Sequence, residues 1–135
     1  MAPATALASA AGELCVDYLL VFIGAGLGGM ARYVVGRAAL TIGGDFPWGT
    51  MAINIAGSLA MGLVAGWFLN RGGADQNLRL FLTTGVIGGF TTFSTFSLEA
   101  ALLWERGQLL AAGLYVGGSV LIGVAGVFVG LAAMR

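Results

Sequence analysis

The chain has 135 residues, of which 59% are hydrophobic and 9% are charged, and its formal net charge is zero. Because a soluble domain carries roughly 25% charged residues, this composition excludes a water-facing globule and indicates that lipid surrounds most of the chain. There is no histidine and a single cysteine, Cys15, which excludes an intrachain disulfide and a cysteine-based metal cluster. Since no nucleophile–base pair with histidine or cysteine can be assembled, we expect no enzyme, and we expect no nucleic-acid partner.

The first 15 residues are rich in alanine and only weakly polar. A secretory signal peptide has basic residues before its apolar stretch, and no basic residue precedes Arg32. The sequence therefore predicts a disordered tail over residues 1–15, followed by a membrane domain over residues 16–135.

Long uncharged intervals predict four membrane-spanning helices. About 20 apolar residues cross a bilayer as a helix, and three intervals between charged residues hold 25, 19 and 28 residues. The first apolar segment is shorter, but it resumes beyond Arg32, so we expect one helix with an arginine near its end. The expected fold is an all-α integral membrane protein with four transmembrane helices per subunit. The predicted spans are 18–40, 47–70, 78–103 and 107–133.

The arginines do not select one orientation in the membrane. Cytoplasmic loops of membrane proteins carry an excess of Lys and Arg. Three arginines fall on each predicted side, Arg32, Arg37 and Arg106 against Arg71, Arg79 and Arg135. Two interpretations stay open: the chain inserts both ways and pairs as an antiparallel dimer, or another feature sets a fixed orientation.

Glycines spaced four residues apart recur along the predicted spans. Small residues at this spacing let membrane helices approach closely, so we expect most of them to serve helix packing. The pairs are Gly24/Gly28, Gly62/Gly66, Gly85/Gly89, Gly113/Gly117 and Gly126/Gly130. Residues 24–29 also match the GxGxxG dinucleotide fingerprint. The acid that follows, Asp45, lies in a predicted loop and the chain offers no α/β domain, which argues against a nucleotide site.

Polar side chains line one face of two predicted spans. On the second span Thr50, Asn54 and Ser58 recur at every fourth residue, and on the fourth Tyr115 and Ser119 share a face. Polar groups inside a membrane usually face the protein interior. Asn54 either holds the bundle together by a hydrogen bond or donates to an anion. Tyr115 belongs either to an interfacial aromatic belt or to a line of hydroxyls.

The third predicted span carries the most informative segment, residues 88–97. Two adjacent glycines followed by three threonines within five residues disfavour a continuous helix, which predicts a helix broken in the middle of the membrane. Unwound backbone at that depth is tolerated where it is buried or lines a cavity, and broken transporter helices bring free carbonyls to ion sites. The alternative is a continuous helix whose hydroxyls bond back to their own carbonyls.

The segment GGFTTFSTFS at residues 88–97 resembles the signature of the Fluc (CrcB) fluoride channel family. The segments GGMARY at residues 28–33 and GTMAIN at residues 49–54 resemble motifs of its first and second spans, and order and spacing match over residues 18–134. The resemblance implies a fluoride-selective anion channel in the inner membrane of a bacterial cell, where passive fluoride export reduces cytoplasmic toxicity.

The resemblance also implies an assembly and a set of site residues. The assembly is an antiparallel dual-topology homodimer with two pores and a structural sodium ion on its axis, held by the backbone carbonyls of Gly88 and Thr91. Arg32 either draws anions toward the pore or snorkels from a helix end, and the role of Glu99 stays open. The implied fluoride pore is lined by Asn54, Phe93, Thr95, Phe96, Tyr115 and Ser119, with Arg32 assigned to it as well.

The chemistry of the implied path is coherent, with one departure from the family pattern. Hydroxyls and the Asn54 amide can replace the water of a fluoride ion, and phenyl ring edges carry partial positive charge. The fourth-span polar face often continues with a hydroxyl one turn beyond Ser119, where this chain has Gly123, so the far end of the path is an open question. The competing interpretation is a small dual-topology proton-coupled multidrug exporter, for which Glu99 is the sole candidate carboxylate.

Overall fold

The computed structural model describes residues 4–71 and 75–135, and all regular structure in this part of the chain is helical. The first helical path comprises α1 (Ala4–Ala39) and η1 (Leu40–Ile42), and the second is α2 (Trp48–Asn70). The third comprises α3 (Gln76–Leu80), the π-helical η2 (Phe81–Ile87), α4 (Gly88–Phe90) and α5 (Phe93–Glu105). The last is α6 (Leu109–Ala133).

Four helical paths in the described part are long and apolar enough to cross a membrane, over residues 12–42, 48–70, 76–105 and 109–133. The predicted four-span, all-α architecture is therefore confirmed. α1 begins at Ala4, inside the segment 1–15 for which the sequence predicts a disordered tail, and residues 1–3 lie outside the described part. The cause is compositional: alanine has the highest helix propensity of all residues, so an alanine-rich segment extends the helix.

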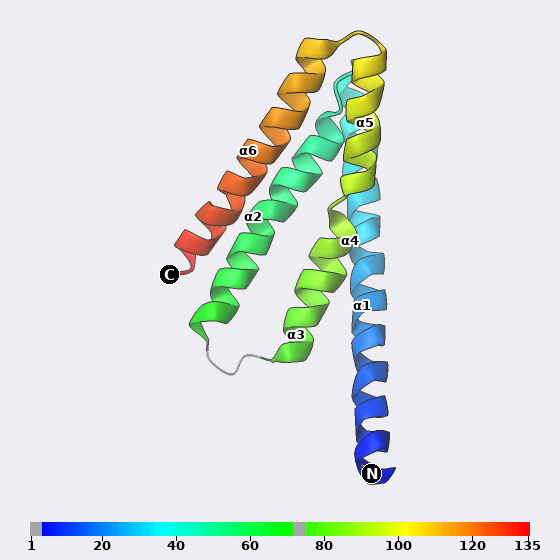
Figure 1. The fold of residues 1–135 in the computed structure, drawn as a ribbon, viewed down its shortest axis with the longest axis vertical. Helices are drawn as coiled ribbons and strands as arrows, with labels where there is room; N and C mark the ends of the chain where they lie inside the picture. Colours follow the sequence, from blue (N-terminus) through cyan, green and yellow to red (C-terminus); the bar gives the residue numbers. More distant parts are fainter. Residues whose placement is uncertain (1–3, 72–74) are drawn as a thin grey trace.

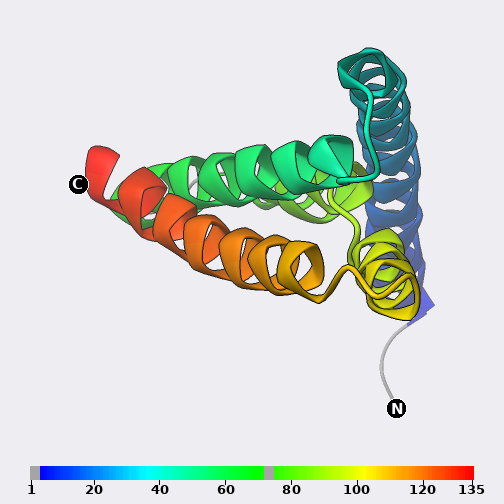
Figure 2. The same cartoon turned by 90° about the horizontal axis from the view of Figure 1, so that it is seen from above.

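The helices form two neighbouring groups (Figure 1). α2 and α6 lie side by side over most of their length and run in the same direction. α1 packs along η2 and α4, and α5 contacts α6. Figure 2, seen from above, shows α5 end-on between α1 and α6. The interruption between α4 and α5 therefore lies where the two groups meet, which is also where the polar residues gather.

Glycines bring the helices of each group into backbone contact. A Cβ added to Gly24 would lie 2.8 Å from Cα of Gly85, and one added to Gly89 would lie 2.7 Å from Cα of Ala25. The packing role is confirmed for both members of Gly24/Gly28, Gly62/Gly66 and Gly85/Gly89 and for Gly130, whereas a Cβ on Gly126 would make only ordinary contacts of 3.5 Å or more. Gly113 and Gly117 differ, because a Cβ on either would meet no atom of the described residues within 4 Å.

α2 and α6 keep one register along their shared length. A Cβ on Gly66 would lie 3.3 Å from Cα of Leu131, and one on Gly123 would lie 3.3 Å from Oγ of Ser58. Gly62 faces Val127 at the level between these two contacts. Because the helices run in the same direction, the turns of α2 and α6 can be matched one by one.

The third helical path is interrupted after α4. Thr91 (φ −77°, ψ 160°) and Thr92 (φ −150°, ψ 123°) have extended backbone, and α5 begins at Phe93. Thr92 is the N-cap of α5, since its hydroxyl accepts a hydrogen bond from the backbone N–H of Thr95 at 3.3 Å. The π-helical η2 lies immediately before α4, and π-helical turns often occur next to functional sites.

The contact between Gly24 and Gly85 gives a test of the fold with a matched control on the same helix. Gly24→Ala should destabilise the protein by about 1–3 kcal/mol, because the added methyl group meets the η2 backbone. Gly26→Ala should be neutral or stabilising, since a Cβ there meets nothing within 4 Å and alanine favours helix over glycine by about 1 kcal/mol. Thermal unfolding of both variants in detergent, followed by size-exclusion chromatography, checks this. Equal midpoints would contradict it.

Candidate functional site

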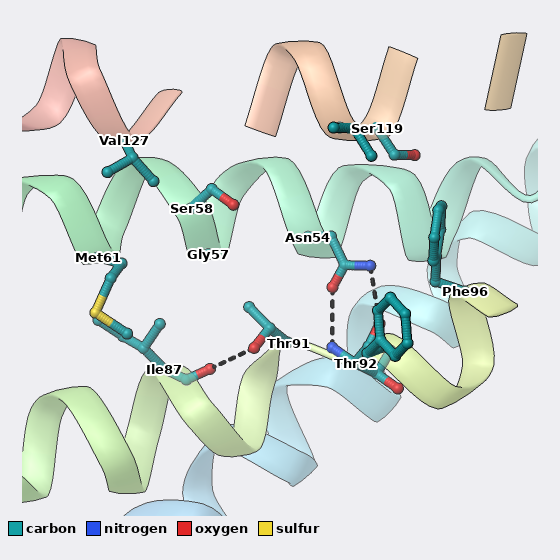
Figure 3. A pocket seen from close by; sticks show the side chains of 12 residues that line it. Asn54, Gly57, Ser58, Met61, Ile87, Thr91, Thr92, Phe96, Ser119 and Val127 are labelled. Carbon is teal, nitrogen blue, oxygen red and sulfur yellow. Dashed lines mark hydrogen bonds between the residues drawn. The ribbon is translucent and has the colours of Figure 1, made fainter. Parts of the chain in front are cut away.

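The side chain of Asn54 binds both backbone polar groups of one residue, Thr92, at the interruption of the third path. Its Nδ2 donates to the carbonyl of Thr92 at 3.0 Å, and its Oδ1 accepts from the N–H of Thr92 at 2.9 Å (Figure 3). Thr92 is buried, so an unpaired N–H or C=O there would be costly. The amide replaces the partners that a helix would have given these groups, so the hydrogen bond between spans that was one interpretation of Asn54 is present.

The interruption also releases two carbonyl oxygens. In a continuous helix the N–H of Thr92 would bond to the carbonyl of Gly88, and the N–H of Thr95 would bond to the carbonyl of Thr91. Here the N–H of Thr92 goes to Asn54, and the N–H of Thr95 goes to the Thr92 hydroxyl. The carbonyls of Gly88 and Thr91 have thereby lost their helical donors and can accept another donor or bind a cation.

A hollow of about 350 Å³, called here the first hollow, lies beside this interruption (Figure 3). Its polar wall comes from three helical paths, and two phenyl rings close one side. The residues that line it include Asn54, Ser58, Thr91, Thr92, Phe93, Phe96 and Ser119. Ser119 is 8% exposed, and its hydroxyl has no hydrogen-bond partner among the described residues. A buried hydroxyl without a partner is costly, so this one is available to a small ligand or to water.

Three aromatic rings lead from the exposed edge of the first hollow into the protein. The ring of Phe93, which is 80% exposed, lies 5.9 Å from the ring of Phe96. The ring of Phe96 lies 5.1 Å from the ring of Tyr115, which is fully buried. The rings of both pairs meet in tilted arrangements, with interplanar angles of 39° and 46°, as aromatic pairs do when a positive ring edge approaches a negative ring face.

A second hollow of about 490 Å³ shares Thr92 with the first. Its remaining polar lining comes from Arg32, Tyr33, Thr50, Thr95 and Glu99. Arg32 is partly buried, and no carboxylate of the described residues lies within ion-pair distance of it. The second hollow therefore combines an arginine that carries a full positive charge with hydroxyls and with the carboxylate of Glu99, so charges of both signs border it.

Glu99 joins α5 to the same faces of α2 and α6. Its two carboxylate oxygens accept one hydrogen bond each, from the hydroxyl of Thr50 at 3.0 Å and from the hydroxyl of Tyr115 at 2.7 Å. Tyr115 is fully buried and bonded to Glu99, which favours the line of hydroxyls over an interfacial aromatic belt. The carboxylate fixes where both hydroxyls point.

The structure brings most of the predicted site residues to the two hollows. The first hollow receives Asn54, Thr91, Phe93, Phe96 and Ser119, the second receives Arg32 and Thr95, and Tyr115 packs against Phe96. Gly88 is exposed and lines neither hollow. The sequence did not single out Thr92 as the partner of Asn54. Its position three residues before Thr95 at the start of α5 is an N-cap pattern that could have found it.

Comparison with known protein families identifies the family of this chain. Residues 19–131 match the family described as CrcB-like protein, Camphor Resistance (CrcB). This chain belongs to that family. The predicted family is therefore confirmed, and together with the four long apolar helices it makes the chain a multi-pass membrane protein.

Three similar curated relatives of this CrcB-like protein share a name. The fluoride-specific ion channel FluC of Methylobacterium nodulans is 67% identical over 120 residues, which are 89% of this chain and 97% of the relative. The protein of the same name from Methylobacterium sp. is 64% identical over the same shares, and that from Rhodopseudomonas palustris is 55% identical over 89% of this chain and 98% of its own length. The name is that of an ion channel, in agreement with the expectation of no enzyme.

The two hydrogen bonds of Asn54 give a test of the site. Asn54→Ala leaves both the N–H and the carbonyl of buried Thr92 without a partner and should destabilise the protein by about 2–4 kcal/mol, since each unsatisfied buried group costs about 1–3 kcal/mol. Asn54→Asp keeps the acceptor for the N–H, so the Thr92 amide should stay protected from exchange, while the new carboxylate oxygen facing the Thr92 carbonyl lowers stability for a different reason. Thermal unfolding in detergent and hydrogen exchange of the Thr92 amide check both. Wild-type protection of that amide in Asn54→Ala would contradict the arrangement.

Proposed function

We propose that this protein is a fluoride-selective channel that lets fluoride leave a bacterial cell passively across its inner membrane, and so reduces fluoride toxicity. The observation that carries the proposal is the identity of 55–67% to relatives named fluoride-specific ion channels, over nearly their full length. The site residues by which the sequence resembles this family gather around two adjoining hollows.

The first hollow has the chemistry that a fluoride path requires. Fluoride is small and strongly hydrated, so the path must offer donors in place of water. The Ser119 hydroxyl has no partner among the described residues, and the Asn54 amide carries a second hydrogen beyond the one given to Thr92. The rings of Phe93 and Phe96 border the same space. Since the chain has no lysine, no ammonium traps the ion, and conduction requires sites weak enough to release it.

Passive flow is favoured over proton-coupled export. The exporter interpretation needs a membrane carboxylate that is free to bind and release protons in each cycle. Glu99 instead has both oxygens occupied as acceptors, by Thr50 and by Tyr115. This geometry supports a role in orienting two hydroxyls along the anion path, with Arg32 in the adjoining hollow attracting the anion.

The proposed assembly is an antiparallel dual-topology homodimer with two pores. Its support is the balance of arginines between the two sides of the membrane and the exposure of site residues on a single subunit. Phe93 is 80% exposed although it lines the first hollow, and Gly88 is exposed although its carbonyl has lost its helical donor. A second subunit over this surface would enclose both.

A structural sodium ion on the dimer axis belongs to the same proposal. Hard cations prefer oxygen ligands, and backbone carbonyls serve such ions in proteins. The carbonyls of Gly88 and Thr91 fit this requirement, because Thr92 and Thr95 donate their N–H groups elsewhere. Two carbonyls from each of two subunits would give four oxygens, and the charge of the ion would offset part of the cost of desolvating an anion nearby.

The channel proposal predicts passive fluoride efflux. Liposomes that hold the purified protein and are loaded with potassium fluoride should release fluoride once a potassium ionophore supplies a counter-ion path, because no gradient is needed to drive a channel. Liposomes loaded with potassium chloride should release far less of their anion, because hydroxyls spaced for fluoride do not replace the water of a larger ion as well. A fluoride electrode and a chloride electrode make the comparison. Efflux that occurs only with a proton gradient would refute passive flow.

The assembly proposal predicts a difference between two substitutions beside the freed carbonyls. Gly88→Val should lower the dimer fraction at least tenfold while leaving the subunit folded. Within the subunit a Cβ at Gly88 meets only the Thr83 carbonyl, at 3.4 Å, and in the proposed dimer the larger side chain would crowd the second subunit. Thr91→Ser keeps the carbonyl and the hydroxyl that bonds to Ile87 and should dimerise normally. Sedimentation in detergent checks this. A terminal tag accessible from only one side of the membrane would contradict the antiparallel arrangement.

A further inference from the structure

Ser58 and Gly123 form a complementary pair between α2 and α6. A Cβ on Gly123 would lie 3.3 Å from Oγ of Ser58 and 3.9 Å from its Cβ. The first of these distances is tighter than ordinary van der Waals contact, so a larger residue at position 123 would displace the Ser58 hydroxyl. The glycine on α6 therefore makes the room in which the serine side chain of α2 lies.

The pair occupies a defined level in a series of polar positions. On α2 the series runs through Thr50, Asn54 and Ser58, one turn apart, and on α6 it runs through Tyr115 and Ser119 to Gly123. At the first level the two helices meet through Glu99, which binds Thr50 and Tyr115. At the third level Ser58 meets Gly123 directly. Every level thus has a hydroxyl or an amide, but at the third it comes from α2 alone.

We propose that Ser58 supplies the hydroxyl that α6 lacks at Gly123 and is a further anion-binding residue of the fluoride path. The proposal rests on the channel function proposed above. Ser58 lines the first hollow together with Asn54 and Ser119 (Figure 3), and it is only partly buried. Its hydroxyl forms no hydrogen bond with any described residue, unlike the hydroxyls of Thr83 and Ser97, which bond to carbonyls of their own helices.

The lining beyond Ser58 shows why this hydroxyl matters. The same hollow is bounded by Met61, Ile87 and Val127, none of which has a hydrogen-bond donor in its side chain. Without Ser58 an anion that passes Ser119 would meet an apolar wall on both α2 and α6. A dehydrated anion there would have no donors over a full helical turn, which is unfavourable for an ion. With Ser58 the line of donors continues.

The experiment removes the hydroxyl from α2 and returns it from α6. Ser58→Ala should slow fluoride efflux from proteoliposomes about tenfold, the effect of one lost donor to an ion. The double variant Ser58→Ala/Gly123→Ser should recover most of the rate, because the new Cβ would lie at an ordinary distance of 3.9 Å from the Cβ at position 58. A matched control, Ser58→Ala/Ala125→Ser, adds the same hydroxyl to an exposed face of α6 and should stay slow.

The outcomes separate this inference from the function on which it rests. If the wild type releases no fluoride, the channel function fails. If the wild type conducts and Ser58→Ala conducts equally well, Ser58 is a packing residue and the inference is overturned. Equal recovery by the Gly123→Ser and Ala125→Ser double variants would also overturn it, because position would then not matter. Thermal unfolding of each variant shows whether a slow rate reflects misfolding, and a slow Ser58→Ala with a wild-type midpoint supports the inference.

Discussion

The two hydrogen bonds between the Asn54 amide and the backbone of Thr92 are the interactions on which the rest of the site depends. They give hydrogen-bond partners to the N–H and C=O of Thr92, which is buried and not helical. This offsets the cost of interrupting the third path inside an apolar protein. The same interruption leaves two neighbouring carbonyls without their helical donors. Because the Thr92 N–H is used, the carbonyl of Gly88 is released, and because the Thr92 hydroxyl caps α5, the carbonyl of Thr91 is released too.

The same restart of the helix positions the aromatic residues. α5 begins at Phe93, so Phe93 and Phe96 fall within its first turn, directly beside the first hollow. From there α5 carries Glu99 to a level where it meets Thr50 and Tyr115. A single short extended segment therefore sets the place of the rings, of the carboxylate and of the released carbonyls. Freed acceptors and oriented donors therefore lie only a few residues apart along the third path.

Much of this could be predicted from the sequence because its strongest signals are local. Uncharged intervals locate membrane spans, the four-residue spacing of Thr50, Asn54 and Ser58 defines a helix face, and the run of Gly and Thr at residues 88–97 contains the two extended residues. What could not be predicted depends on which spans meet. Asn54 pairs with Thr92 of another span, and Glu99 accepts hydrogen bonds from two other spans. Residue spacing within one helix cannot predict either contact. The start of α1 at Ala4 reflects the helix propensity of alanine, which the prediction of a tail over residues 1–15 did not take into account.

The length of α1 has a consequence for how the protein meets water. The helix has 36 residues, which at about 1.5 Å per residue gives roughly 54 Å, whereas the hydrocarbon core of a bilayer is about 30 Å thick. Even a tilted helix of this length stands clear of the lipid at one end, and its acidic residues Glu13 and Asp17 lie toward that end. The N-terminal end of α1 would then protrude from the membrane as a rigid helix that carries negative charge. In the proposed antiparallel dimer one such helix end would protrude on each side of the membrane, so the same acidic surface would face both aqueous compartments.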